Sequence, residues 1–598
     1  MNSQEISDLI NSDFEEYPDD SDDDPTWELS HNNNLTNESD SETDEIKTNR
    51  CLFPETSNLS NHNADPLAVY MDFEEDNVYD SDVSHISDSV DDFIVTHKPR
   101  GRPKNPVSEP NRQWRVDDKV INNFIFNPNN EITGINPDIF DTMIDGSPLD
   151  FYQLIVDDGI LGKIVIETNR YASQQISGKN ISPHSRLNKW KDTNVIELKQ
   201  FFGLLMWTGL VQLPTYELYW SNSKIYNTEF GTIMSRNRFE ILLQMIHFSD
   251  NNQIDKTNRL YKLGTILDDI MINSNMCMKP GESFCIDESL IKFMGRLSFK
   301  QYIKNKRNKF GIKLFKLCIH PCYTLAVKVY CGKEANPDFN VGSKIVQELS
   351  EPFLNCGRTL VVDNWYASVE LAELLNSKQT HLVGTLRTNR KSNPTEVTAK
   401  KLKKGEISSM RISSNILVLK WRDKRELCMI SSKHHSQMVK LSVRGKTIMK
   451  PKVVMDYNEG KSPIDLSDQM SAYSNPLRRC VKWYRKVVID ALLNIAVVNA
   501  HVLFTQVTDN KISITEFRTM LVENLITKDF EPIESINQIK HKLVKTIKGR
   551  CNKCYKKMVK EKGRTYSQKY SKKTSTKCEA CDQKICFECF FEDHKVSK

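Results

Sequence analysis

The chain has 598 residues, enough for several domains, and its charge is distributed very unevenly. Residues 1–98 hold 27 acidic and 3 basic side chains, whereas residues 99–598 hold 51 acidic and 79 basic ones. A basic body with an acidic arm indicates a polyanionic partner, with nucleic acid as the leading candidate and an acidic membrane surface as the second. The acidic N-terminus is unlike a secretory signal. The most apolar run, residues 487–504, is broken by polar side chains and predicts a core helix rather than a membrane span.

Residues 1–112 are predicted to form a disordered acidic arm. They are rich in Asp, Glu, Ser and Asn, and they lack the periodic apolar pattern needed to offset the entropy lost on ordering. The arm ends in a basic segment, "HKPRGRPKN" (97–105), which contains Arg100 and Arg102. An Arg-Gly-Arg-Pro core resembles an AT-hook, whose arginines enter the narrow minor groove of A·T tracts. A nuclear import signal or a flexible basic linker explains the same residues, so these readings stay open.

Residues 113–281 are predicted to be mostly helical. The stretches "VIELKQFFGLLMWTGLVQL" (195–213) and "MSRNRFEILLQMIHFSD" (234–250) both carry apolar residues at helical spacing. In the second stretch, Asn237 and Glu240 have the spacing of a capping box.

Strands then alternate with helices over residues 282–390, which predicts a mixed α/β sheet. "SFCIDESLIKF" (283–293) is predicted to be a short strand ending in an acid, and residues 310–330 a hairpin that turns near His320-Pro321. "RTLVVDNWYAS" (358–368) is predicted to be a buried strand ending in another acid, and residues 381–387 a further strand.

The remaining chain divides into four more segments. Residues 391–449 contain short strands with polar turns and are predicted to be a β-rich insertion, after which the α/β pattern resumes over residues 450–475. Residues 476–540 are predicted to be helical, and residues 541–598 form a cysteine-rich end.

Three acids, taken together, suggest a catalytic site that binds a divalent cation. Asp287 and Asp363 end predicted strands, and Asp465 is placed at the start of a helical segment. Strand ends on one side of an α/β sheet share a crevice, where converging carboxylates favour a divalent cation such as Mg²⁺ or Mn²⁺. Two such ions suit the displacement of a phosphodiester. The alternatives are structural: Asp287 as a helix cap, Asp363 in an Asx-turn, and Asp465 or Asp468 as helix caps.

Several blocks of the sequence resemble those of piggyBac-family transposases over roughly residues 115–598. They are "IDESLIKFMGRLSFKQYIKNKRNKFGIKLFKLC" (286–318), "VVDNWYASVELAELL" (361–375), "VGTLRTNRKSNP" (383–394), the stretch from "YNEGKSPIDLSDQM" to residue 500, and the cysteine-rich tail. The resemblance implies an RNase H-like catalytic domain, residues 282–390 and 450–475, split by the insertion. It also implies a dimerisation and DNA-binding domain built from residues 113–281 and 476–540.

The same resemblance assigns roles to individual residues. The family's catalytic acids match Asp287, Asp363 and Asp465, and a fourth family acid matches Asp468. Basic positions near target DNA match Arg387 and Arg390. A tryptophan close to the active site matches Trp483, which is therefore also expected to contact DNA. This sequence departs from the family pattern at Ser462-Pro463, where glycines usually precede the third acid.

Basic residues crowd the segment that follows the first acid. They are Arg296, Lys300, Lys304, Lys306, Arg307 and Lys309. In a basic body with an acid triad, these side chains are expected to contact DNA phosphates without reading sequence. A solvated strand face is the structural alternative.

The tail predicts a zinc module. It carries three Cys-x2-Cys pairs and a histidine, namely Cys551, Cys554, Cys578, Cys581, Cys586, Cys589 and His594. One zinc ion could use the first and last pairs, and a second the middle pair with His594 and an unidentified fourth ligand. Between the pairs the tail is strongly basic, which favours DNA over the RING or PHD roles that a similar cysteine pattern serves.

The sequence therefore predicts a DNA transposase of cut-and-paste type that uses Mg²⁺ or Mn²⁺ at its acids and one or two Zn²⁺ ions in its tail. Its expected partner is double-stranded DNA in the nucleus. The resemblance to the piggyBac family implies that this DNA is transposon ends and a TTAA target, bound by a homodimer. A domesticated relative that binds DNA or chromatin without transposing is the alternative, and a zinc-module ubiquitin ligase or histone reader is third, because it leaves the acids unexplained.

Overall fold

In a computed structural model, the chain is described from residue 112 onward, with gaps. The described residues are 112–116, 124–128, 133–178, 184–226, 228–253, 257–303, 309–332, 341–443, 446–477, 482–527, 543–578 and 583–594. The predicted acidic arm with Arg100 and Arg102 therefore lies outside them, as do Lys304, Lys306 and Cys581.

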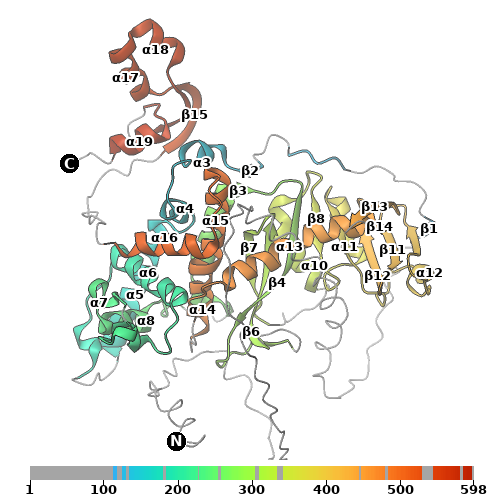
Figure 1. Cartoon of the computed structure of the whole chain (residues 1–598), viewed down its shortest axis with the longest axis horizontal. Coiled ribbons are helices and arrows are strands. Elements are labelled where there is room, and N and C mark those ends of the chain that lie inside the picture. Colours follow the sequence, from blue (N-terminus) through green and yellow to red (C-terminus); the bar gives the residue numbers. More distant parts are fainter. Residues whose placement is uncertain are drawn as a thin grey trace, which may run out of the picture.

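A mixed sheet forms the centre of the described fold (Figure 1). Its first strands are β4 Ser283–Lys292, β5 Gln301–Tyr302, β6 Phe310–Ile319, β7 Tyr323–Val329, β8 Thr359–Val362 and β9 His381–Thr385. β4 pairs antiparallel with β6 and parallel with β8. β7 and the short β5 pair antiparallel with β6, and β9 pairs parallel with β8. Across this part of the sheet the order is β7-β6-β4-β8-β9, an antiparallel meander followed by two strands parallel to β4.

The predicted alternation of strands and helices is confirmed in this region. The hairpin turn between β6 and β7 falls at His320-Pro321, whose peptide bond is cis. Helices α10 Val341–Ser350 and α11 Val369–Ser377 connect β7 to β8 and β8 to β9. The four residues of β8 are all buried, because helices and neighbouring strands enclose them on both faces.

The β-rich segment continues the same sheet. Its members are α12 Thr395–Thr398, β10 Ile407–Arg411, β11 Leu417–Arg422, β12 Glu426–Ser431, β13 Met438–Val443 and β14 Lys446–Pro451. β12 pairs antiparallel with β9, followed outward by β11, β10 and the two-residue strand β1 Arg115–Val116. β13 and β14 pair only with each other among the described strands. The insertion is therefore mainly an extension of the central sheet.

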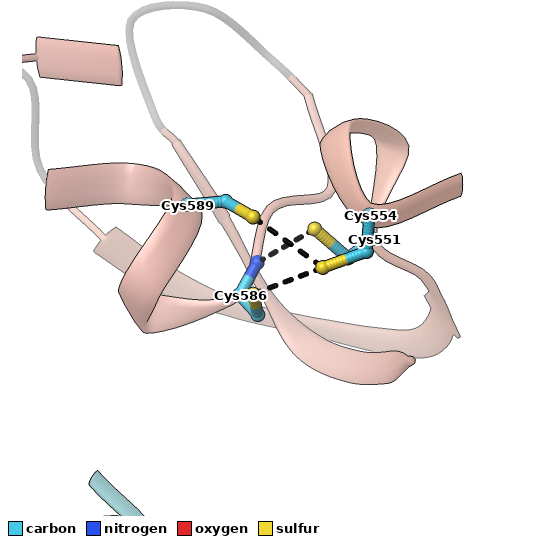
Figure 2. Close-up of side chains that lie close together, drawn as sticks. All are labelled: Cys551, Cys554, Cys586 and Cys589. Atoms are coloured by element: carbon cyan, nitrogen blue, oxygen red, sulfur yellow. Dashed lines mark hydrogen bonds between the residues drawn. The ribbon is translucent and has the colours of Figure 1, made fainter. Parts of the chain in front are cut away.

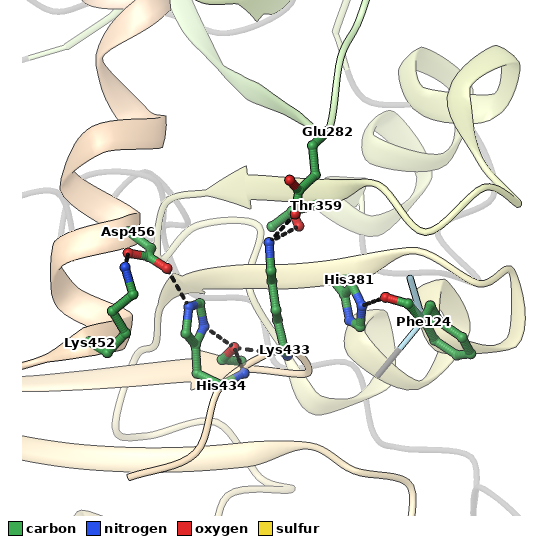
Figure 3. Close-up of polar contacts among 9 residues, drawn as sticks. Phe124, Glu282, Thr359, His381, Lys433, His434, Lys452 and Asp456 are labelled. Carbon is green, nitrogen blue, oxygen red and sulfur yellow. Dashed lines mark hydrogen bonds and ion pairs between the residues drawn. The ribbon is translucent and has the colours of Figure 1, made fainter. Parts of the chain in front are cut away.

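The described part of residues 112–128 packs on this sheet, although the predicted boundaries assigned Arg112 to the acidic arm and residues 113–128 to the helical domain. The Arg112 guanidinium donates to both carboxylate oxygens of Glu373 on α11, at 3.0 and 2.8 Å. The Phe124 carbonyl oxygen lies 3.0 Å from Nε2 of His381 at the start of β9 (Figure 3). Such contacts join positions more than 250 residues apart, so local sequence pattern gives no sign of them.

Helix α13 Lys452–Ala472 lies across one face of the sheet. Its apolar side chains pack with Cys285, Cys318 and Val361. At Gly460 the helix approaches the sheet so closely that an added Cβ would lie 2.6 Å from Cγ2 of Val361. The helix also runs through Pro463, which is buried.

The two predicted helical segments come together in space (Figure 1). The main helices of the first segment are α4 Pro148–Ile155, α5 Asp158–Gly178, α6 Val195–Leu210, α8 Arg236–Met245 and α9 Ile266–Cys277. The same segment also contains the smaller elements β2 Gly134–Ile135, α3 Pro137–Thr142, α7 Phe230–Ile233 and β3 Met278–Lys279. The later helices are α14 Trp483–Asp490, α15 Ala496–Thr508 and α16 Ile514–Ile526, with a π-helical turn, Ala491–Ile495, between α14 and α15. α15 packs against α4 and α16 against α6.

In these two segments, the helices lie where the sequence predicted them, but the N-cap of α8 differs from the prediction. α8 begins after Ser235, whose hydroxyl accepts from the backbone N–H of Arg238. The predicted capping box at Asn237 and Glu240 is therefore wrong. The stretch Trp483–Thr508 is long and apolar enough to cross a membrane, yet its apolar window is entirely buried inside the described fold. This confirms the predicted core helix.

The C-terminal residues form a small separate hairpin-and-helix unit. Its elements are β15 Leu543–Arg550, α17 Asn552–Lys562, α18 Arg564–Tyr570, β16 Lys573–Cys578 and α19 Phe587–His594. β15 and β16 pair antiparallel, and the buried residues at the centre of the unit are mainly cysteines.

Candidate functional site: an acid cluster on the sheet and a cysteine cluster in the tail

Strand register brings the first two predicted acids together. In the parallel pair of β4 and β8, Ile286 lies beside Val362. Asp287 follows Ile286 and Asp363 follows Val362, so the two acids occupy neighbouring positions at the point where β8 ends. Asp287 itself lies in the middle of β4, because pairing with β6 continues to Lys292. The prediction that Asp287 ends its strand is therefore wrong, as is the alternative that it caps a following helix.

Asp363 follows β8 immediately, as predicted. Its Oδ1 accepts a hydrogen bond of 2.8 Å from the backbone N–H of Trp365, which makes the Asx-type turn considered as its structural role. The turn fixes the carboxylate at the strand end. A structural role and a place in the acid cluster are therefore compatible for this residue.

The third acid comes from helix α13, at a different place than predicted. Asp465 lies well inside the helix, which begins at Lys452 with Pro451 at its N-cap position. The expectation that Asp465 starts a helical segment, and the alternative that it caps one, are both wrong. Asp465 is exposed, whereas Asp287 and Asp363 are half-buried. Gly460 and Pro463 are unfavourable inside an isolated helix, but packing on the sheet keeps this stretch helical.

Electrostatics indicate that the acids act on one another. Burial, Asp363 and Glu288 raise the pKa of Asp287 well above its ordinary value, and Asp465 adds to the same effect. Burial and Glu288 raise the pKa of Asp363 to about 6, against opposing contributions from backbone N–H groups and Arg387. Carboxylates in this situation repel one another unless a cation or a proton compensates them.

This donor set fits a hard divalent cation, because Mg²⁺ and Mn²⁺ take carboxylate oxygens as ligands and keep open positions for phosphate. The carboxylates are nevertheless not drawn tightly together. Among the described residues, one group of three or more potential ligand residues has its ligand atoms all within 4.8 Å of one another, and that group is formed by cysteines. The acid cluster is therefore more open in this structure than the cysteine cluster.

Asp468 faces the sheet one turn beyond Asp465 but has its own partners. Its Oδ1 lies 2.7 Å from Nζ of Lys316 on β6 and accepts a hydrogen bond of 2.8 Å from Ser289 Oγ on β4. These contacts favour a structural role for Asp468. Lys316 was missed in the sequence, although a lysine inside an otherwise apolar strand, "FGIKLFKLCI", was a visible signal.

The described basic residues among those predicted to contact DNA lie in two places. Nε of Arg387 lies 3.2 Å from Oδ1 of Asn364, and Arg390 donates to the Trp365 carbonyl oxygen at 2.7 Å. Both arginines are thus tied to the loop that carries Asp363. Arg296 and Lys309 are exposed on the segment after β4.

Trp483 does not present a contact surface. It is 6% exposed and packs edge-to-face on Phe299, with ring centroids 5.2 Å apart. The prediction that it contacts DNA rests on the family resemblance alone, since its described surroundings are those of a core residue.

The tail contains a metal-ligand cluster, shown in Figure 2. Its four sulfur atoms, from Cys551, Cys554, Cys586 and Cys589, all lie within 4.8 Å of one another. Sγ of Cys554 lies 3.7 Å from that of Cys586 and 3.4 Å from that of Cys589. Four cysteines at this spacing fit a closed tetrahedral Zn²⁺ site.

This cluster combines the first and last Cys-x2-Cys pairs, as one of the two predicted sites required. Cys578 is buried nearby but does not belong to the four-cysteine group. Cys581 and the side chain of His594 lie outside the described residues, so the second predicted zinc site stays a prediction.

Comparisons with known proteins identify the family of the chain. A family profile described as Transposase IS4 matches residues 147–501. PiggyBac transposable element-derived protein 3 from Homo sapiens is 25% identical over 475 residues, covering 75% of this chain and 76% of that protein. PiggyBac transposable element-derived protein 2 from Homo sapiens is 26% identical over 371 residues, covering 58% of this chain and 60% of that protein.

A solved structure shares the fold. It is the piggyBac transposase in a cryo-EM structure of its synaptic complex with hairpin DNA, with a TM-score of 0.59 and 22% identity, covering 77% of this chain and 98% of that one. Since the matching profile spans more than half of the sequence, this chain belongs to the Transposase IS4 family, in its piggyBac branch.

Proposed function

We propose that this protein is a metal-dependent DNA transposase of cut-and-paste type, with an RNase H-like catalytic core. The observation that carries the proposal is the register of β4 and β8, which sets Asp287 beside Asp363 while α13 supplies Asp465. These three side chains would hold Mg²⁺ or Mn²⁺. When bound, such ions stabilise the attacking and leaving oxygens of an in-line phosphodiester displacement.

The proposed reaction begins with hydrolysis of one strand at the element end. The freed 3′-hydroxyl attacks the opposite strand to form a hairpin, which is reopened before the end is joined to a TTAA target. In these steps the chain's basic residues bind phosphates and orient the DNA, with Arg387 and Arg390 beside Asp363, and Arg296, Lys304, Lys306 and Lys309 beyond β4.

The other proposed parts serve DNA capture. Cys551, Cys554, Cys586 and Cys589 would hold Zn²⁺ and so keep the basic tail folded for binding the element ends. Pairing two ends requires a homodimer, and DNA as the substrate requires nuclear access, for which Arg100 and Arg102 are candidate import or minor-groove residues.

The test is an excision assay on a plasmid that carries the flanking element ends. Wild type is expected to excise, and Asp287→Asn and Asp465→Ala are expected to lose excision by several orders of magnitude, while still binding the ends. Glu459→Gln is the matched control, because it removes an exposed acid from the same helix as Asp465. Excision by Asp465→Ala at the wild-type rate would remove this residue from the chemistry.

The alternative is a domesticated protein that binds DNA without transposing. It is favoured by the names of the two human relatives, which describe proteins derived from transposable elements. Wild type that binds genuine ends tightly and neither nicks nor excises them would support this alternative.

A further inference from the structure

Lys316 is a buried cation directly beside the first acid. It lies on β6 as the cross-strand partner of Asp287 on β4, so both side chains leave the same face of the sheet. This face is the one that α13 covers. Lys316 is 2% exposed, and a lysine is seldom buried so completely unless its charge is paired.

The pairing partner comes from the helix. Nζ of Lys316 and Oγ of Ser289 both donate to Oδ1 of Asp468, at 2.7 and 2.8 Å. The two donors belong to neighbouring strands of the sheet and the acceptor belongs to α13. One carboxylate oxygen thus ties the helix to β4 and β6 at once.

A second acid acts electrostatically on Lys316. Asp490, at the end of α14, is buried, and its Oδ1 accepts a hydrogen bond of 2.7 Å from Asn494. Burial raises the pKa of Asp490, and the nearby Lys316 opposes that rise. Burial alone would lower the pKa of Lys316, but its anionic neighbours, Asp468 first, raise it. The lysine is therefore held as a cation between the helix that carries the third acid and the core helix α14.

The other half of α13 has a separate attachment, shown in Figure 3. Asp456 pairs with Nε2 of His434 after β12 at 2.8 Å, and with Lys452 of its own helix at 2.6 Å. Between the two attachments, Gly460 rests against β8. The Lys316–Asp468 pair is an ionic attachment in the half of α13 that contains Asp465, and the hydroxyls of Ser467 and Thr324, 3.4 Å apart, add a neutral contact to β7.

Helix geometry links this attachment to the acid cluster. Residues three apart on a helix share a face, so fixing Asp468 on the sheet also fixes the direction of Asp465. A rotation of α13 by one residue, about 100°, would turn Asp465 away from Asp287. A buried ion pair adds little net stability over apolar residues, and its best-supported use is to select one register.

We propose that Lys316 is a positioning residue for the active site: by pairing with Asp468 it fixes the rotation of α13, so that Asp465 is delivered beside Asp287. In this arrangement Asp468 is the docking partner of Lys316 and does not bind the cation. The inference rests on the proposed function to the extent that Asp287, Asp363 and Asp465 are the cation ligands.

Positioning and a purely electrostatic role for Lys316 predict opposite changes in cation binding when Lys316 is removed. A buried cation near the cluster repels a divalent ion, so its removal would tighten binding if charge were its only contribution. It would also release the Asp468 carboxylate as an additional ligand. A positioning role requires that removing Lys316 weakens binding instead. The sign of the change therefore separates the two.

The experiment measures Mn²⁺ binding to the zinc-loaded, full-length protein without DNA, by electron paramagnetic resonance of free Mn²⁺. Asp287→Asn defines binding that does not involve the acid cluster. Lys316→Met is expected to weaken cluster binding on the order of 10–100-fold, the usual effect of losing a residue that orients metal ligands. Lys420→Met is the matched control, because Lys420 is similarly buried and pairs at 2.8 Å with Glu426, whose 35% exposure equals that of Asp468.

Three further variants guard against misfolding, which thermal melting monitors. Ser289→Ala removes one donor to Asp468 and should weaken binding less than Lys316→Met. Lys316→Arg retains the charge and should recover part of the affinity. Lys316→Met with Asp468→Leu replaces the ion pair by apolar contact and should restore affinity if Asp468 only docks the helix.

The outcomes distinguish this inference from the proposed function. Binding by Lys316→Met that equals or exceeds wild type, in a folded protein, overturns the positioning role and leaves the proposed function intact. An apolar double variant that stays weak while folded overturns the docking role of Asp468. Wild-type binding that Asp287→Asn does not reduce overturns both the proposed function and this inference.

Discussion

At the scale of single residues, the acid cluster is held by the fold against its own repulsion. Asp287 and Asp363 both have raised pKa values, because burial and Glu288 disfavour their charged forms. The fold keeps them adjacent because β4 and β8 pair through buried residues, Phe284 to Ile286 on β4 and all four residues of β8. A bound divalent cation would offset the free-energy cost of ionising these carboxylates. Without the cation, that cost makes the stability of the fold depend on pH.

The stability of the metal-free protein should therefore fall as Asp363 ionises. Its pKa is about 6 in the folded protein and near 3.8 when unperturbed, so the folded state binds the proton more tightly. The resulting stability is present below pH 4 and is lost as pH rises through about 6, and it amounts to about 2–3 kcal/mol. Asp363→Asn should gain this amount relative to wild type between pH 4 and 7, in urea unfolding with EDTA. Asp509→Asn, an exposed acid elsewhere, is the control, and a pH-independent difference would contradict the assignment.

At the scale of elements, the sequence predicted those strands, turns and helices that depend on neighbouring residues alone. The strands around Asp287 and Asp363, the hairpin at His320-Pro321 and the core helix Trp483–Thr508 followed from apolar runs and turn residues. The sequence placed Asp465 at the start of a helical segment, whereas α13 begins at Lys452. Gly460 and Pro463 weaken a helix in isolation but are tolerated when the sheet supports it.

Contacts between distant segments had no local signal. The addition of β1 to the sheet, the attachment of Arg112 to α11 and the Lys316–Asp468 pair all join residues more than 150 positions apart. The site was predictable as a set of acids that resembles a family pattern, although only Asp363 ends its strand as expected. The residues that position those acids were not, because their roles exist only in the packed molecule.

Close packing of α13 on β8 gives a prediction at this scale. Gly460→Ala would place a Cβ 2.6 Å from Cγ2 of Val361, so the helix must shift outward. We expect a loss of about 1–3 kcal/mol in the free energy of unfolding, typical of overpacking. We also expect weaker Mn²⁺ binding at the cluster, because Asp465 moves with the helix.

The control for this substitution is Gly162→Ala in α5. An added Cβ there has nothing within 4 Å, so the change should stabilise the helix by roughly 0.5–1 kcal/mol. If Gly460→Ala also stabilised the protein, the close approach of α13 to β8 would not be a constraint.

The cysteine cluster gives a second prediction at the scale of elements. Cys554→Ser should remove about one zinc ion per chain, because three thiolates and a hydroxyl make a poor closed site. Proteolysis should then cut the tail within residues 543–594, while the main body keeps its melting temperature, since the tail has its own buried cluster. Elemental analysis and limited proteolysis test this, and Cys356→Ser, away from the cluster, is the control. Unchanged zinc content would exclude the cluster as the zinc site.

At the scale of the whole molecule, charge is divided between two parts of one chain. The acidic residues 1–98 carry a net charge of −24, and the remainder carries +28. Attraction between such parts is long-ranged at low ionic strength and is screened by salt. Non-specific affinity for DNA depends on the same positive charge, so the arm and the DNA phosphates compete for it.

Deletion of residues 1–98 should therefore tighten binding to an unrelated DNA duplex at low salt. The net charge rises from +4 to +28, and the deleted protein should show a steeper dependence of affinity on salt, because more counterions are released on binding. The difference should shrink as salt approaches about 1 M, where the screening length is about 3 Å. Fluorescence anisotropy over a salt series measures it.

Two full-length controls separate charge from sequence in this prediction. An arm with the same composition in shuffled order should behave as wild type, since only its charge acts. An arm of equal length with Asp and Glu replaced by Asn and Gln should behave as the deletion. If the shuffled arm instead behaved as the deletion, the arm would act through a specific sequence, and electrostatic competition would be the wrong account of its function.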